Sequence, residues 1–292
     1  MRALSGPLLL LAAAGFPVAA GATPGEPQQD WQQVARCGGF LEAPTRLPSG
    51  DLAVSDPLNG RLLRIDPHGQ CHELLRSDDL PNGQAIDADG NLIVARRGGL
   101  MRVDPVTGTI TPLVEQFEGE PLDIANDLSV DRHGGIYFTV PGRSNLLRPD
   151  GRVFYLPAGS REPDLVAGGL AFPNGVAVAP DGNSIRVAEF AAKRILWIPT
   201  RHSTLKFNVP HVFAHTVGGV GPDGLAFDAD GVLYAANIEA GTVSRWTPAG
   251  APLPDLKLPP EAGLLVTNVL VEDGWLYVTE AAQGVVWRVR LD

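Results

Sequence analysis

The chain has 292 residues and a formal net charge of −10, and 44% of its residues are hydrophobic. The acidic balance excludes partners that are held by clustered Lys and Arg, namely nucleic acid and anionic membrane surfaces. The hydrophobic content is ample for a buried core, and 34 Gly and 26 Pro supply many turns.

Residues 1–22 are typical of a secretory signal peptide. Arg2 precedes an apolar run, and small residues follow that suit cleavage after Ala20 or Ala22. An uncleaved anchor is the alternative, although the run is short and is broken by Gly15 and Pro17. We therefore expect an exported protein, periplasmic or extracellular, with no membrane association after cleavage.

Residues 23–30 are polar and rich in Pro, which predicts a flexible lead before a single domain over residues 31–292. The only two cysteines are Cys37 and Cys71. An oxidising compartment permits a disulfide between them, but the spacing in sequence does not decide whether their Cα atoms lie within bridging distance.

Six copies of one unit fill the rest of the chain. Each copy begins with an oxygen-bearing residue, continues through an apolar strand to a Gly, and ends in a second apolar strand. The leading residues lie 40, 44, 48, 49 and 45 positions apart: Glu42, Asn82, Asn126, Asn174, Asp223 and Asn268. This interval is typical of four-stranded propeller blades. We predict an all-β fold, a six-bladed β-propeller with four-stranded antiparallel blades.

Taken in chain order, the strands leave one blade incomplete. Residues 31–37 form a lone strand before the first copy, and the last copy has only three evident strands, so the N-terminal strand is expected to complete the last blade and close the ring. In the third blade, strand three is expected at 145–150 and strand four at 152–157. Residues 200–208 of the fourth blade are expected to form an inserted loop before a strand at 211–216.

The innermost strand of every blade starts near the axis of a propeller, so the six leading residues should converge there. Carboxylate and amide oxygens are the ligands of hard divalent cations. Ca²⁺ fits this set best, and Zn²⁺, Mn²⁺ and Mg²⁺ remain open. An alternative is that the residues followed by Gly only form turns. That alternative does not explain Glu42, Asn126 or Asn268, which Gly does not follow.

The loops after the second strands should lie on the same face as the leading residues and shape substrate choice. The candidates for substrate binding are Asn82, Asn126, Asn268 and Arg96. Arg96 would hold an anionic or carbonyl-bearing ligand, or is an ordinary surface arginine. His211 and His215 lie in a strand without the Glu of a zinc-protease motif, so no metal site is expected there.

Several segments together resemble the family of regucalcin, gluconolactonase and related lactonases. They are Glu42-Ala43-Pro44, ANDLSVDRHGGIYFT from Ala125, FPNGVAVAPDGNSIRVAE from Phe172, GPDGLAFDADGVLYAA from Gly221 and TNVLVEDGWLYVTEA from Thr267. The resemblance implies a six-bladed propeller that holds a divalent metal and hydrolyses lactones or, in some branches, phosphoesters. It also implies that Glu42, Asn174 and Asp223 bind the metal, that Asn126 is a fourth ligand or contacts substrate, and that Asp223 assists the attack of water.

Two departures keep other functions open. Sugar-lactone members usually carry Arg two residues before the third-blade Asn, where this chain has Ile124. The segments around Asn126 and Asn174 also resemble the strictosidine-synthase-like branch, whose founding enzymes condense an amine with an aldehyde without a metal. A non-enzymatic binding propeller with a structural ion is the third possibility. We expect an exported metal-dependent lactonase that acts on a lactone or related ester, most simply as a monomer.

Overall fold

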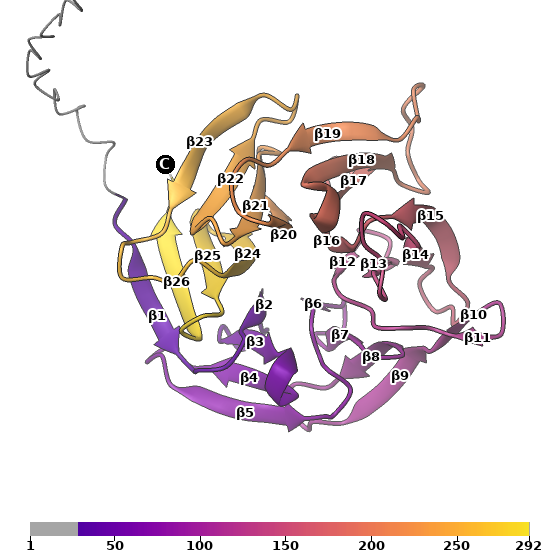
Figure 1. Cartoon of the computed structure of the whole chain (residues 1–292). Helices are drawn as coiled ribbons and strands as arrows, with labels where there is room; N and C mark the ends of the chain where they lie inside the picture. The colour runs from indigo at the N-terminus through magenta and orange to yellow at the C-terminus, as the bar shows by residue number, and fades with distance from the viewer. Residues whose placement is uncertain (1–28, 292) are drawn as a thin grey trace, which may run out of the picture.

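A computed structural model of the chain describes residues 29–291, so the signal-peptide and cleavage-site predictions lie outside the described residues. Six four-stranded antiparallel sheets stand around a central opening (Figure 1). The prediction of an all-β, six-bladed propeller is therefore confirmed. Between residues 29 and 291, no helix has the length and apolar character needed to span a bilayer.

Within each blade the strands follow one another from the axis outward. Blade one is β2 (Glu42–Arg46), β3 (Leu52–Asp56), β4 (Arg61–Ile65) and β5 (Cys71–Arg76); blade two is β6 (Gln84–Ile86), β7 (Leu92–Arg96), β8 (Gly99–Val103) and β9 (Ile110–Val114). Blade three is β12 (Leu128–Val130), β13 (Ile136–Val140), β14 (Gly151–Leu156) and β15 (Asp164–Leu170); blade four is β16 (Pro173–Val178), β17 (Ser184–Glu189), β18 (Arg194–Pro199) and β19 (His211–His215). Blade five is β20 (Gly221–Phe227), β21 (Leu233–Ile238), β22 (Thr242–Trp246) and β23 (Pro252–Lys257); blade six is β24 (Val266–Glu272), β25 (Trp275–Glu280), β26 (Val285–Arg290) and β1 (Gln32–Arg36).

Small elements fill some of the connections. A short hairpin of β10 (Gln116–Phe117) and β11 (Glu120–Pro121) lies between blades two and three. The 3₁₀ turns η1 (Pro57–Asn59) and η2 (Phe190–Ala192) follow β3 and β17.

The repeated glycines form the turn between the first and second strand of each blade. Their φ angles lie between 71° and 90°, a left-handed conformation that Gly adopts without steric cost: Gly50, Gly90, Gly134, Gly182, Gly231 and Gly274. In three of these turns an Asp side chain accepts two backbone N–H groups: Asp87, Asp131 and Asp228. The Gly that repeats in the sequence is therefore the residue that one kind of turn requires, and this turn occurs once in each of the six blades.

Strand β1 closes the ring, as the sequence predicts. It pairs antiparallel with β26, from Gln32 opposite Arg288 to Arg36 opposite Val285, and so becomes the outer strand of blade six. Buried side chains of blades six and one, among them Val54, Tyr277 and Val286, pack together at the junction. The first and last strands of the domain are therefore held in one sheet, and no blade is left incomplete.

A disulfide joins Cys37 to Cys71 across this junction, with their Cα atoms 5.7 Å apart. Cys37 follows β1 in blade six, whereas Cys71 is the first residue of the outer strand of blade one. The bond therefore ties blade six to blade one at the place where the pairing of β1 with β26 closes the ring.

The strand prediction for blade three is wrong in its outer half. Residues 145–150 form a loop, β14 lies directly beside β13, and the outer strand is β15. The Asn145 side chain accepts hydrogen bonds from the N–H groups of Leu147 and Arg148, which forms a turn in place of a strand. The apolar pair Leu146-Leu147 resembles a strand in sequence but is exposed on that loop.

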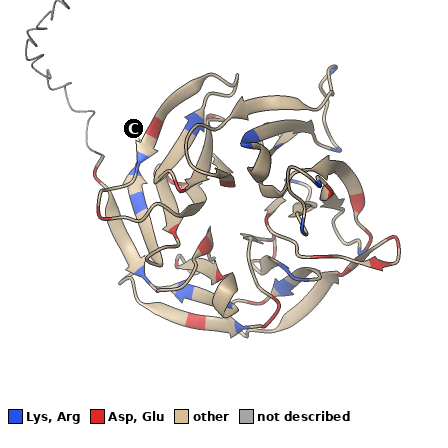
Figure 2. Cartoon of the chain, viewed as in Figure 1, with Lys and Arg blue, Asp and Glu red and all other residues tan. Residues whose placement is uncertain are grey.

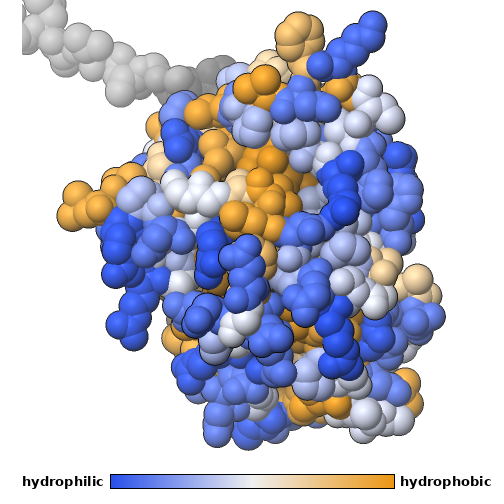
Figure 3. All heavy atoms as spheres, turned by 90° about the vertical axis from the view of Figure 1, so that its right-hand side faces the viewer, coloured by the Kyte–Doolittle hydropathy of each residue, from blue (hydrophilic) through white to orange (hydrophobic). Residues whose placement is uncertain are grey.

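The outer flank of blades three and four also exposes apolar side chains. Figure 3 shows this side of the molecule, with an orange apolar area among polar atoms. The outer strands β15 and β19 carry the exposed residues Leu165 and Val212. The large aromatic residues Tyr137, Phe138 and Phe154 of blade three are fully buried instead.

We predict that loss of the disulfide weakens the fold measurably. The double substitution Cys37→Ser with Cys71→Ser should lower the free energy of unfolding by about 3–4 kcal/mol, because the bond closes a loop of 34 residues in the unfolded chain. Urea denaturation of the variant, and of the unmodified protein with and without reductant, measures this. Equal midpoints in all three samples would show that the bond does not stabilise the ring.

Candidate functional site

The six leading residues lie where the chain reaches the central axis. Four are buried in inner strands: Glu42 in β2, Asn174 in β16, Asp223 in β20 and Asn268 in β24. The other two, Asn82 and Asn126, are half-buried and precede β6 and β12 by two residues. Acidic segments of the inner strands, red in Figure 2, border the central opening.

Breaks in strand pairing occur beside the buried axial residues. In blades one, four, five and six, the register of the inner strand shifts between Glu42 and Thr45, Pro173 and Val176, Pro222 and Leu225, and Val266 and Asn268. A β-bulge changes the direction in which a strand presents its side chains. Without these bulges, regular alternation would send every second side chain into the space between neighbouring blades.

The glycine that follows three of the axial residues is required by close packing, not by a turn. None of Gly83, Gly175 and Gly224 has a positive φ. A Cβ on Gly175 would lie 2.2 Å from the backbone oxygen of Asp223, and one on Gly224 would lie 2.0 Å from Asn268 Oδ1. The inner strands approach each other too closely for a side chain at these positions. Turn formation therefore does not account for the oxygen-bearing residues before them.

The buried axial residues contact one another in pairs. The side-chain amide of Asn268 donates a hydrogen bond to the Glu42 carboxylate, and that of Asn174 donates to Asp223. Asn268 Oδ1 accepts the N–H of Val269 at 2.8 Å, which orients the amide. The structure thus brings together residues from blades one, four, five and six at one place on the axis.

A third buried carboxylate, Asp127, belongs to the same group and was missed by the sequence analysis. It directly follows Asn126, and its Oδ2 accepts the backbone N–H of Val176 at 3.1 Å. Burial raises the pKa of Asp127 to about 7. The one available signal was a second acidic residue immediately after a leading Asn, which occurs in blade three alone.

Burial and neighbouring carboxylates together raise the pKa values of Glu42 and Asp223. Burial and then the charge of Asp127 raise the pKa of Glu42 to about 8. Burial and then the charges of Glu42 and Asp127 raise the pKa of Asp223 well above its ordinary value. No Lys or Arg side chain of residues 29–291 contributes an opposing charge. A bound cation would oppose all three shifts, because it stabilises the charged form of each carboxylate.

The donor set fits a hard divalent cation of the Ca²⁺ type. Glu42 and Asp223 offer carboxylate oxygens, and Asn126 and Asn174 offer amide oxygens. In the described part of the chain, no three Asp, Glu, His or Cys side chains converge closely enough to hold a metal by themselves. A metal at the axis therefore needs the amide oxygens as well, which disfavours a dedicated zinc site.

The backbone beside Glu42 is strained. Ala43 has a φ of 46°, in the left-handed region that L-residues other than Gly avoid. Its carbonyl accepts hydrogen bonds from Gln84 Nε2 at 2.9 Å and Thr45 Oγ1 at 3.2 Å. Gln84, which the sequence analysis did not single out, thus links blade two to the peptide that positions Glu42.

Arg96 lies at the end of β7, where its guanidinium forms ion pairs with acidic side chains. Its guanidinium contacts Glu115 at 2.7 Å and Asp79 at 3.4 Å, and donates to the carbonyl of Arg97 at 3.0 Å. A role for Arg96 in substrate binding stays a prediction.

The last residue of the second strand, which is Arg96 in blade two, is acidic in blades one and four. In these two blades it accepts a hydrogen bond from the connection that leads to the inner strand. Asp56 accepts the N–H of Phe40, and Glu189 accepts that of Ala171.

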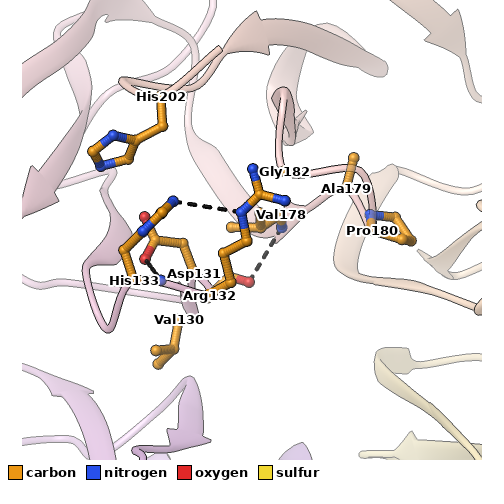
Figure 4. A pocket seen from close by; sticks show the side chains of 10 residues that line it. Val130, Asp131, Arg132, His133, Val178, Ala179, Pro180, Gly182 and His202 are labelled. Atoms are coloured by element: carbon orange, nitrogen blue, oxygen red, sulfur yellow. Dashed lines mark hydrogen bonds between the residues drawn. The ribbon is translucent and has the colours of Figure 1, made fainter. Parts of the chain in front are cut away.

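Two pockets lie away from the loops that surround the axial residues. One, of about 410 Å³, is lined by the inner strands and has Asp127 and Asn268 among its wall residues. The other, of about 190 Å³, lies between blades three and four and contains none of the six leading residues. Figure 4 shows the side chains that line it, where the rings of His133 and His202 are 4.4 Å apart. His202, which has no evident partner in sequence, therefore contacts His133.

A family model, described as the SMP-30/Gluconolactonase/LRE-like region, matches residues 41–289. The chain belongs to this family. It is 32% identical over 183 residues to a gluconolactonase from Zymomonas mobilis, covering 53% of this chain and 48% of that protein. It is 26% identical over 245 residues to lactonase drp35 from Staphylococcus saprophyticus, covering 79% of this chain and 74% of that one. The chain thus spans about half of the first relative and about three quarters of the second.

Solved structures of the same fold are more distant in sequence. A gluconolactonase from Xanthomonas campestris superposes with a TM-score of 0.78 at 24% identity, covering 90% of this chain and 89% of that one. A calcium-binding protein, regucalcin, from Agrobacterium tumefaciens superposes with a TM-score of 0.76 at 20% identity, covering 89% and 93%. A virginiamycin B lyase from Staphylococcus aureus shares the fold at a TM-score of 0.64 and 13% identity, covering 88% of this chain and 82% of that one. The fold alone therefore does not assign an activity.

The close packing of the inner strands can be tested at Gly224. We expect Gly224→Ala to lower the free energy of unfolding by about 1–3 kcal/mol, because the new Cβ would overlap Asn268. Gly168→Ala is the matched control, since its Cβ would lie 3.9 Å from the nearest atom and its φ is not positive. Denaturation curves of the two variants compare them directly, and equal losses would contradict the packing argument.

The strain at Ala43 predicts an unusual response to glycine. Ala43→Gly should leave the free energy of unfolding unchanged or raise it by up to about 1 kcal/mol, because relief of the left-handed conformation offsets the greater entropy of unfolded Gly. Ala53→Gly in the middle of β3, which is fully buried, should instead destabilise by about 1 kcal/mol. A comparable loss at both positions, measured by urea denaturation, would show that Ala43 is not strained.

Proposed function

We propose that this protein is an exported, metal-dependent lactonase that uses water to open a lactone to a hydroxy acid. One observation carries the proposal: Glu42, Asp127 and Asp223 are buried around one axis, and no cationic side chain of residues 29–291 balances them. Membership of the family and the similarity to gluconolactonase and lactonase drp35 support the reaction class.

Glu42, Asn126, Asn174 and Asp223 would hold the metal. Oxygen donors alone favour Ca²⁺, with Zn²⁺, Mn²⁺ or Mg²⁺ as weaker candidates. Asn268 holds the Glu42 carboxylate and Asn174 holds that of Asp223 through hydrogen bonds. The half-buried Asn82 would contact a substrate from the open side, as would Asn126 if it is not the fourth metal ligand.

The chain's own residues would handle the charge and the proton of the reaction. A bound divalent ion would polarise the lactone carbonyl and lower the pKa of a bound water. The Asp223 carboxylate would accept the proton of the attacking water through the oxygen that is not needed to bind the metal. The amide of Asn126 would hold the ring ester or complete the metal ligands. Glu42 keeps the site negative enough to retain a cation.

Export is supported by the disulfide between Cys37 and Cys71. Such bonds persist in oxidising compartments and are rare in the reducing cytosol. We propose a periplasmic or extracellular location for the protein. The metal-free, amine-condensing alternative is less consistent with this site, because three buried carboxylates without a cation would be costly to retain.

Metal removal and substitution of Asp223 test the proposal together. Chelation should abolish hydrolysis of a lactone panel, and return of Ca²⁺ should restore it. Asp223→Ala should lower kcat/KM by at least about 100-fold, because both a metal ligand and the proton acceptor are lost. Activity is followed by acid release, and bound metal by elemental analysis.

The control for Asp223→Ala is Asp230→Ala. Asp230 is an exposed acid in the turn of the same blade, and its loss should leave both activity and metal content unchanged. Full activity after exhaustive chelation would overturn the metal-dependent mechanism.

A further inference from the structure

The positions two residues before the axial residues share a property that the proposed chemistry does not use. All six are apolar or Gly: Phe40, Leu80, Ile124, Phe172, Gly221 and Val266. They lie where the chain comes from an outer strand toward the axis, on the face where the axial residues begin. Four of them, Phe40, Leu80, Ile124 and Phe172, are half-exposed, and we call these four the collar.

Phe172, a member of the collar, has a backbone conformation that residues other than Gly rarely adopt. Its φ is 61°, and its N–H donates to Ser144 Oγ at 3.0 Å. Its ring lies 5.6 Å from that of Phe190. Strain of this kind persists at sites where the surroundings fix it, and it is a frequent feature of ligand-binding positions.

The second ring of this pair packs against the strand that carries Asp223. A Cβ on Gly221, two residues before Asp223, would lie 2.9 Å from a ring carbon of Phe190. Phe172 is itself two residues before Asn174. The aromatic pair therefore stands between the segments that lead to two of the proposed metal ligands.

Exposed apolar residues continue outward from the collar on the same face. Leu58, Leu147, Val217 and Leu264 are 72%, 97%, 84% and 59% exposed, and each comes from a different connection between strands. Since each of these residues comes from a separate connection, the inference below rests on the collar and not on them.

Polar groups that would bind sugar hydroxyls are absent from the collar positions. A polyhydroxylated ring would place hydroxyl groups against phenyl and aliphatic side chains, which removes water from them without replacing its hydrogen bonds. The nearby guanidinium of Arg96 is engaged by Glu115 and Asp79. The four collar positions themselves therefore offer apolar contacts, while the exposed charged residues Arg97 and Asp123 lie next to Ile124.

We propose that the substrate is a lactone with an apolar alkyl or aryl substituent, whose ring ester lies at the axial residues and whose substituent lies against the collar. This inference rests on the lactonase function proposed above. The inference goes beyond that function because it names the lactones that the protein should hydrolyse with the highest kcat/KM.

A series of γ-lactones with one ring and increasing chain length tests the inference. The probes are γ-butyrolactone and its γ-propyl and γ-hexyl derivatives, with glucono-δ-lactone as the polar comparison. kcat/KM should rise by up to about fourfold for each methylene that is buried, and glucono-δ-lactone should be poorer than the hexyl compound. A flat series, or a preference for glucono-δ-lactone, would overturn the proposal.

Two substitutions assign the effect to the collar. Ile124→Asn and Phe172→Asn should each reduce the rise with chain length, and Asn tolerates the positive φ at position 172. Val106→Asn is the matched control, because Val106 is 91% exposed in the connection between β8 and β9. It should retain the full chain-length dependence. Unchanged dependence in both collar variants would contradict the assignment.

A binding measurement separates this inference from the lactonase proposal. The 2-alkylcyclopentanones present a ring carbonyl and an alkyl chain but have no ester bond to hydrolyse. Their affinities, measured by calorimetry, should rise with chain length and fall in the collar variants, whether or not any lactone is turned over. Rising affinity without hydrolysis would refute the lactonase function and uphold the collar, whereas flat affinity would refute the collar.

Discussion

Negative charge buried around a single axis is the constraint on which this structure depends. Each of Glu42, Asp127 and Asp223 is favourable in the interior only if it is protonated or balanced by a cation. Protein side chains could have supplied that cation, as Arg61 does for Asp56 and Arg194 does for Glu189 at the ends of neighbouring strands. At the axis the neighbouring side chains are amides instead, and this absence of an opposing charge among residues 29–291 is what supports our proposal of a bound ion.

The propeller holds these groups together by packing the inner strands closely. Gly83, Gly175 and Gly224 remove the side chains that would separate neighbouring blades, and β-bulges change the direction of the axial side chains. The ring must also stay closed, since each axial residue comes from a different blade. Pairing of β1 with β26 and the disulfide between Cys37 and Cys71 serve this closure. The geometry of the axial site therefore depends on closure of the whole ring.

Polar and apolar residues occupy different depths of the site. Carboxylates and amides occupy the axis, where burial strengthens their electrostatic interactions. Apolar residues occupy the collar, where under our proposal they would contact the substituent of the lactone. One member of the collar, Ile124, stands where the sugar-lactone members of the family that the sequence resembles usually carry Arg.

The sequence by itself determined the number of blades, the closing strand and the residues nearest the axis, because a repeated turn demands Gly at a left-handed position and repeats its spacing. It did not determine the outer half of blade three, where Leu146 and Leu147 resemble a strand but the side chain of Asn145 forms a turn. Nor did it show Asp127, Gln84 or the strain at Ala43, since these depend on contacts between blades. Features that repeat along the chain can be found in the sequence, whereas contacts between strands far apart in sequence form only when the ring closes.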